Sequence, residues 1–118
     1  MAVSDALTVS EERRAGVTVV RCAGEIDLAT VGVLRNRLVE AQVDGPSTLV
    51  VVLDEVTFID SLGLGALIGA HKRARVLQGS MVIVCTSRPV LGVFAATAMD
   101  RVFRVVASID EALGDPIP

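Results

Sequence analysis

The chain has 118 residues, of which 52% are hydrophobic and 21% charged, so its length suits one domain with a buried core. A net charge of −3 and the absence of Trp and Tyr argue against nucleic-acid binding, which calls for a basic face and aromatic rings. One His and two Cys provide too few ligands for a zinc site, and we expect neither a metal nor a cofactor.

The sequence also lacks the signals of a membrane or exported protein. The longest apolar run, STLVVVL at residues 47–53, is far too short to span a bilayer, and Asp54 and Glu55 follow it. The first residues show no basic stretch followed by an apolar block and a cleavage site. We therefore expect a cytoplasmic protein without a membrane partner, in which Cys22 and Cys85 are buried, reduced thiols within strands.

The first half of the chain predicts two strands, a helix and a third strand. Residues 7–26 fit two strands joined by a short turn, because apolar and polar residues alternate in VTVVRC. Residues 27–42 have apolar residues at helical spacing from Leu28 onward, and Thr30 or Asp27 is the candidate N-cap. The β-branched run TLVVVL then suits a strand that is covered on both faces.

The second half predicts three helices and two more strands. The first of these helices runs from about Ser61 to Leu77 and ends at Gly79. The elements after it are a strand at 81–86, a short helix at 88–98, a strand at 102–106 and a helix at 108–113. Residues 1–5 and 114–118 are expected to fray.

This order of elements predicts an α/β fold in one domain over residues 1–118. Alternation of strands and helices implies a mixed, mostly parallel sheet with an antiparallel N-terminal strand and about four helices. The carboxyl ends of parallel strands meet at one edge, where ligands and partners bind in such sheets. We therefore expect the loops at residues 25–27, 57–61 and 86–88 to lie together.

The segment FIDSLGLGALIGAH, residues 58–71, places an acid and a hydroxyl at a helix start and then adds three glycines. The segment does not match the pattern of a hydrolytic active site. A nucleophile elbow needs Gly where Ile59 stands, and His71 lies about 15 Å from Ser61 along the same helix, too far to act as its base. The phosphate-binding and receiver patterns each need a lysine that is missing, since Lys72 lies well inside the helix.

Two interpretations of this segment stay open from the residues alone. Either Ser61 or Asp60 is an ordinary helix cap, or Ser61 is a modifiable or partner-bound serine. Each interior glycine costs a helix about 1 kcal/mol relative to alanine, so capping leaves the glycines unexplained. Gly63 and Gly65 leave the amides of the helix start open to a close neighbour. That neighbour is either another backbone, an alternative that stays open for Gly69, or a partner or a phosphate. The basic run from His71 to Arg75 is expected to complement the negative end of the helix, with partner recognition as the alternative.

Three motifs together identify a family. FIDSLGLGALIGAHKRAR, with GEIDLAT upstream and VVVLDEV between them, closely resembles the STAS domain of bacterial anti-sigma-factor antagonists, over essentially the whole chain. In that family the anti-sigma factor is a kinase that phosphorylates the serine after Asp. The resemblance implies phosphorylation of Ser61, the sole acceptor because Leu62 stands where many members carry a second hydroxyl. It also implies a partner-binding set of Asp27, Asp60, Ser61, Leu62, Gly63 and Gly65.

The function implied by this resemblance is a non-enzymatic switch. The unphosphorylated protein would bind an anti-sigma factor with serine kinase activity and so release a sigma factor, and phosphorylation of Ser61 would end binding. A phosphatase would be a further partner. The alternative is a STAS subunit of a transporter or lipid-transport complex, in which Ser61 is only a helix cap.

Overall fold

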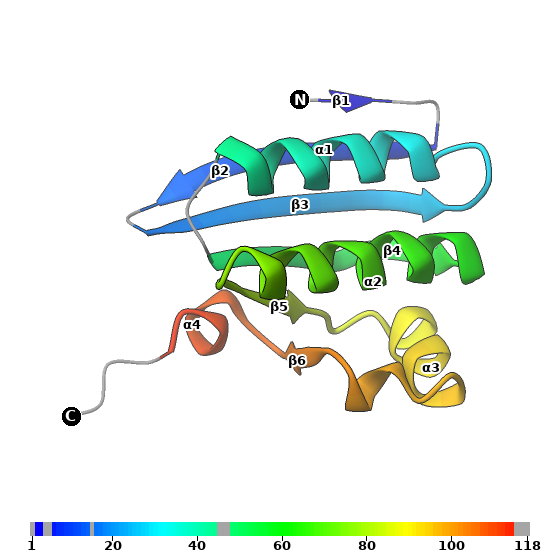
Figure 1. Ribbon diagram of the computed structural model, residues 1–118. Helices are drawn as coiled ribbons and strands as arrows, with labels where there is room; N and C mark the ends of the chain where they lie inside the picture. The colour runs from blue at the N-terminus through cyan, green and yellow to red at the C-terminus, as the bar shows by residue number, and fades with distance from the viewer. Residues whose placement is uncertain (1, 4–5, 15, 45–47, 115–118) are drawn as a thin grey trace.

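The computed structural model describes residues 2–3, 6–14, 16–44 and 48–114. Its strands form one six-stranded sheet in chain order (Figure 1). The strands are β1 (Ala2–Val3), β2 (Leu7–Arg14), β3 (Val17–Ile26), β4 (Thr48–Ile59), β5 (Ser80–Val84) and β6 (Arg104–Val106).

Strand β2 pairs antiparallel with β1 and β3, whereas β3, β4, β5 and β6 run parallel to one another. The mixed, mostly parallel sheet is therefore confirmed. Strand β1 lies within the N-terminal stretch for which the sequence predicted fraying, and pairs Ala2 with Val9. The other residues of the predicted frayed ends, apart from Gly114, lie outside the described residues.

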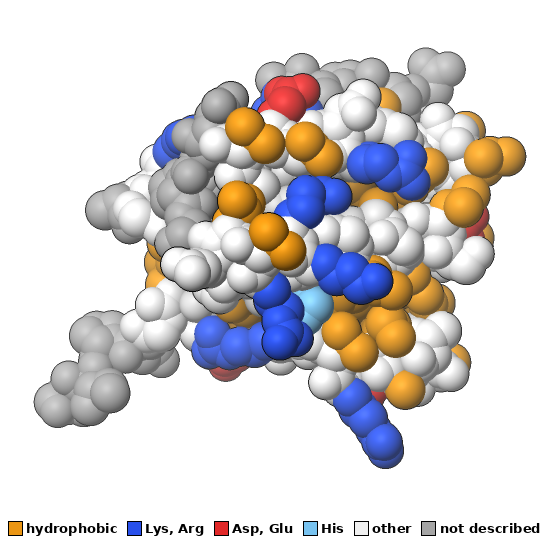
Figure 2. Space-filling view, in the orientation of Figure 1, with side chains coloured by type: hydrophobic (Ala, Val, Ile, Leu, Met, Phe, Trp, Pro, Cys, Tyr) orange, Lys and Arg blue, Asp and Glu red, His pale blue; other side chains and the backbone are white. Residues whose placement is uncertain are grey.

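The helices cover the two faces of the sheet unequally. They are α1 (Val31–Asp44), α2 (Ser61–Val76), α3 (Arg88–Ala96), a 3-10 helix η1 (Met99–Arg101) and α4 (Ile109–Ala112). Helices α1 and α2 lie side by side in Figure 1, and with α3 they enclose the larger core against one face. Helix α4 packs on the other face over a smaller valine cluster. Figure 2 shows the outer side of the α1–α2 layer, over which Lys and Arg side chains are spread.

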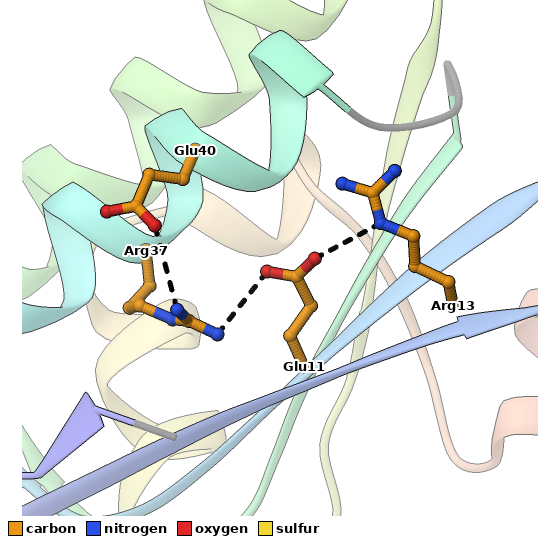
Figure 3. Close-up of polar contacts among 4 residues, drawn as sticks. All are labelled: Glu11, Arg13, Arg37 and Glu40. Atoms are coloured by element: carbon orange, nitrogen blue, oxygen red, sulfur yellow. Dashed lines mark hydrogen bonds and ion pairs between the residues drawn. The ribbon is translucent and has the colours of Figure 1, made fainter.

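A chain of charged side chains fastens α1 to β2 (Figure 3). Glu11 of β2 accepts from Arg13 Nε at 3.3 Å and from Arg37 Nη2 of α1 at 3.4 Å. Arg37 also pairs with Glu40 one turn along the helix, at 3.6 Å. Glu11 and Arg37 are mostly shielded from water, so salt screens this pair less than a fully exposed one. It fixes α1, and with it the loop that enters α1, relative to the sheet.

Within the described part of the chain, no helix is long and apolar enough to cross a membrane.

Candidate functional site

The three predicted loops meet at one edge of the sheet, as expected. Ile26 and Ile59 pair across the ends of β3 and β4, and the Asp60 N–H donates to the Ile26 carbonyl at 3.2 Å. The Ser87 hydroxyl, from the third loop, donates to the Val56 carbonyl at 2.6 Å. The ends of β3 and β4 with the residues that follow them (25–30 and 57–61) and the loop 86–88 thus form one surface, which we call the loop edge.

Asp60, not Ser61, caps α2. Asp60 has an extended backbone, and its Oδ1 accepts from the N–H groups of Leu62 at 3.0 Å and Gly63 at 3.1 Å. These are two of the N–H groups that the first turn of a helix leaves without a partner. The capping interpretation is therefore confirmed for Asp60 and wrong for Ser61, and so the account of Ser61 in the transporter alternative is wrong as well.

Ser61 is the first residue of α2, and its side chain is exposed. Its hydroxyl forms no hydrogen bond to any residue that the structure describes. His71, ten positions further along α2, packs edge-on against Phe103 with ring centroids 6.0 Å apart. The Ser61 hydroxyl is therefore open to an external group and receives no activation from the single histidine.

The loop between β3 and α1 is held by hydrogen bonds to a threonine, which the sequence placed only as a candidate cap. The buried Thr30 hydroxyl accepts from the Asp27 N–H at 2.9 Å and donates to the Glu25 carbonyl at 2.8 Å. Asp27 Oδ1 accepts from the Ala29 N–H at 3.0 Å. Both candidate caps therefore shape this loop.

Leu28, at the tip of this loop, is 78% exposed. The sequence pattern assigned it to the apolar stripe of the helix, but α1 begins only at Val31, so that expectation is wrong. Leu62 and Phe58, from the neighbouring segments, are also exposed. Figure 2 shows orange side chains at the end of the molecule where, in Figure 1, β3 ends and α2 begins. An edge with several solvent-exposed large hydrophobic side chains is typical of a protein-binding surface.

Gly24 of the GEID motif serves the fold of this edge. Its φ is +121°, and a Cβ on it would collide with the backbone carbonyl of Ala6. The neighbouring Glu25 N–H donates to that same carbonyl at 2.8 Å. A side chain at Gly24 would push the N-terminal segment away from β3 and move the loop that carries Asp27.

The first two glycines of α2, Gly63 and Gly65, have different surroundings. A Cβ on Gly63 would lie 2.6 Å from both Ile26 Cγ2 and Ile59 Cγ1, and Gly63 is buried. The neighbours that require this glycine belong to the chain itself, which corrects the expectation of a helix start left open at Gly63. Gly65 is exposed, and nothing lies within 4 Å of a Cβ placed there. Of the two glycines, Gly65 is the one that faces outward.

The chemistry of the loop edge is that of a docking surface with one free hydroxyl. Asp60 and Asp27 both accept backbone hydrogen bonds. Asp54 holds the third loop through Thr86, whose N–H donates at 2.7 Å and whose hydroxyl donates at 3.0 Å. Within the described residues, no group of three or more His, Cys, Asp or Glu side chains is placed to hold a metal ion.

Cys22, on β3, lies in the core, and burial raises its pKa from an ordinary 9.0 to about 12. A thiol whose pKa is 9.0 in the unfolded chain and about 12 in the folded chain favours unfolding as the pH rises above 9, because only the unfolded chain then releases the proton. We expect urea unfolding to show a loss of about 1.4 kcal/mol from this residue between pH 8 and pH 10.

Few other side chains titrate between pH 8 and pH 10, because the chain has no Tyr and Lys72 is its only lysine. Burial also raises the pKa of Cys85, which adds a loss of the same sign. Cys22→Ala removes only the first contribution, so its stability should fall less steeply with pH. Equal slopes for the two proteins would show that Cys22 does not titrate as its burial implies.

Comparison with known proteins agrees with this architecture. The STAS domain family model matches residues 8–112. The anti-sigma-F factor antagonist RsfB of Mycobacterium tuberculosis is 31% identical over 120 residues, covering 96% of this chain and 92% of RsfB. The crystal structure of an anti-sigma factor antagonist from Mycobacterium paratuberculosis superposes with a TM-score of 0.86 at 27% identity, over 96% of each chain.

The Bacillus cell fate determinant SpoIIAA in its phosphorylated form has the same fold, with a TM-score of 0.69 at 20% identity over 90% of this chain and 96% of SpoIIAA. The match of the family model spans most of the chain, and the relative RsfB is aligned over nearly its whole length. The chain therefore belongs to the STAS domain family, and it is similar to the anti-sigma factor antagonists of that family.

Proposed function

We propose that this protein is a cytoplasmic anti-sigma factor antagonist whose binding is switched by phosphorylation of Ser61. The observation that carries the proposal is the position of Ser61. It is the first residue of α2, its side chain is exposed, and Asp60 rather than Ser61 caps the helix. The names of the relatives, RsfB among them, support the class of partner. The phosphorylated form of SpoIIAA shows that a protein of this fold is known with a phosphate attached.

The partner surface in this proposal is the loop edge. Leu28 and Leu62 supply exposed apolar contact area at this edge, and Asp27 and Asp60 hold their loops in place by accepting backbone N–H groups. Buried apolar anchors carry most of the affinity of protein interfaces. An anti-sigma factor seated here would cover the Ser61 hydroxyl and pass over the open side of Gly65.

Phosphorylation would occur on this same surface. A kinase that presents ATP to the loop edge transfers the γ-phosphoryl group to Ser61 Oγ. The new O–P bond forms as the bond to ADP breaks, and the hydroxyl proton passes to a base of the kinase. The product carries about −1.5 to −2 charges, which a seated partner would have to desolvate. A phosphatase restores the binding form by hydrolysis of the phosphoserine.

The partner surface is tested by matched substitutions of two exposed apolar residues, one just before α1 and one near its far end. Leu28 lies in the loop before α1 and is 78% exposed, and Val43 lies near its far end and is 69% exposed. We expect Leu28→Asp to weaken binding of the purified anti-sigma factor at least tenfold, because it places a charge in the apolar contact. Val43→Asp should leave the affinity within about threefold of the wild-type value. Isothermal titration calorimetry measures both.

Circular dichroism spectra of both variants check that the fold is intact. Equal losses of affinity, or a larger loss for Val43→Asp, would place the interface away from the loop edge.

A further inference from the structure

A concave surface lies at the other end of α2, away from Ser61. It is a hollow of about 350 Å³ between the last turns of α2 and strands β5 and β6. Its lining includes three cationic or titratable side chains, His71, Arg75 and Arg104. Arg75 lies fourteen residues after Ser61 on the same helix, which corresponds to about 21 Å. The hollow is therefore separate from the loop edge.

The two arginines that line this hollow take part in no ion pair with a described residue. Among the described residues, no acidic side chain forms an ion pair with Arg75 or Arg104. Arg104 Nη2 donates to the backbone carbonyl of Glu111 at 3.2 Å, while the Glu111 carboxylate accepts from the Ala107 N–H at 2.9 Å. The residues that line the hollow include no Asp or Glu, although the whole chain carries −3.

The basic surface extends beyond the hollow. Lys72 is exposed on the outer side of α2. Burial, and then repulsion from Arg35 of α1, lowers the pKa of Arg73. Figure 2 shows blue side chains around the single pale-blue histidine on this face. Such a field raises the local concentration of anions and guides them toward the hollow.

Helix-dipole compensation explains only part of this arrangement. Arg73 and Arg75 lie in the last turn of α2, where cations are favoured. Arg104 belongs to β6, so the dipole of α2 does not explain its position, yet it lines the same hollow as Arg75. Convergence of side chains from separate elements on one space is the pattern of a ligand site.

We propose that this hollow binds the phosphate group of a small phosphorylated molecule. Arg75, Arg104, His71 and Ser80 are among the residues that line the hollow, and guanidinium groups suit the several acceptor oxygens of a phosphate. Ala74 and Met81 supply apolar walls for the rest of the molecule. The volume falls at the small end of the range for ligand pockets, which favours a small molecule over a peptide chain.

The single histidine makes the test direct. Inorganic phosphate, and then pyrophosphate, is added to the ¹⁵N-labelled full chain at constant ionic strength set with NaCl. We expect saturable shifts of the His71 imidazole signals and of the Gly79 and Ser80 amides, with the Ser61 and Leu62 amides unmoved. Shifts that grow linearly without saturation, or that centre on Ser61, would overturn the proposal.

Two variants distinguish phosphate binding in the hollow from general attraction of phosphate to positive charge. Arg75→Gln should weaken phosphate binding at least about tenfold, because it removes a charge-assisted hydrogen bond. Arg88→Gln, an equal change of charge at an exposed arginine on α3, should leave the binding unchanged. If Arg75→Gln fails to fold, Ser80→Ala provides the same comparison. Equal affinities in the variants, or saturation by a poly-glutamate peptide but by neither phosphate, would contradict a phosphate site.

Discussion

Phosphorylation of Ser61 is expected to weaken binding of the anti-sigma factor at least a hundredfold while changing the stability of the domain little. The loss of affinity follows from placing a dianion on a surface that the partner must desolvate, which costs several kcal/mol. A hundredfold loss corresponds to about 2.7 kcal/mol. Titration calorimetry of the phosphorylated and unphosphorylated forms measures this change.

The small effect on stability follows from two opposing terms at the start of α2. Repulsion between the phosphate and the Asp60 carboxylate is roughly 0.7 kcal/mol per unit charge at about 6 Å in water. The positive end of the helix dipole favours the phosphate by about 0.3–1 kcal/mol. The Leu62 and Gly63 N–H groups already donate to Asp60, so we expect the repulsion to prevail slightly.

A net change of up to about 1 kcal/mol lowers the midpoint of thermal unfolding by roughly 5 °C or less in a domain of this size. Circular dichroism follows this midpoint, since Trp and Tyr are absent. Ser61→Ala serves as the control and should bind within about threefold of the unmodified protein. A much larger shift of the midpoint on phosphorylation would mean that the switch remodels the domain, which contradicts a purely surface effect.

Valine at Gly63 and valine at Gly65 are expected to have opposite consequences, although the two positions are only two residues apart. At Gly63 the new Cβ meets Ile26 and Ile59 at 2.6 Å, and overpacking of this kind costs about 3 kcal/mol. We therefore expect the midpoint of Gly63→Val to fall by about 10 °C or more. At Gly65 there is open space, and the helix propensity of valine slightly exceeds that of glycine.

Gly65→Val should therefore keep the wild-type midpoint, yet bind the anti-sigma factor at least tenfold more weakly because its side chain faces the partner. Thermal unfolding and titration calorimetry on the same preparations separate the two effects. A strong loss of stability in Gly65→Val, or undiminished binding by it, would refute the assignment of the open side of α2 to the interface.

The order of elements was predictable from the sequence because each depends on local patterns. Alternation in β3, the β-branched run in β4 and the three- and four-residue spacing in α2 all act over short distances. From the alternation of strands and helices, the parallel sheet and the meeting of the loops at one edge follow by general rules of chain topology. That is why the place of Ser61 in the fold could be predicted.

The details of the site depend on contacts between distant residues and could not be predicted in this way. Asp60 and Ser61 are both good capping residues by type, and the extended backbone of Asp60, whose N–H bonds to Ile26, decides between them. Gly63 is explained by Ile26, 37 positions earlier in the chain. Leu28 is exposed because the Thr30 hydroxyl bonds to Glu25 and holds a loop where the apolar spacing predicted a helix.

The central claim, that Ser61 is the residue through which the loop edge is switched, is tested most directly by mapping the phosphate. The purified protein is incubated with its anti-sigma factor kinase and ATP, and the product is digested and analysed by mass spectrometry. The account predicts one phosphate per chain, located on Ser61, and none on Ser61→Ala. A phosphate on another residue of the loop edge, such as Thr57 or Ser87, or undiminished labelling of Ser61→Ala, would contradict it.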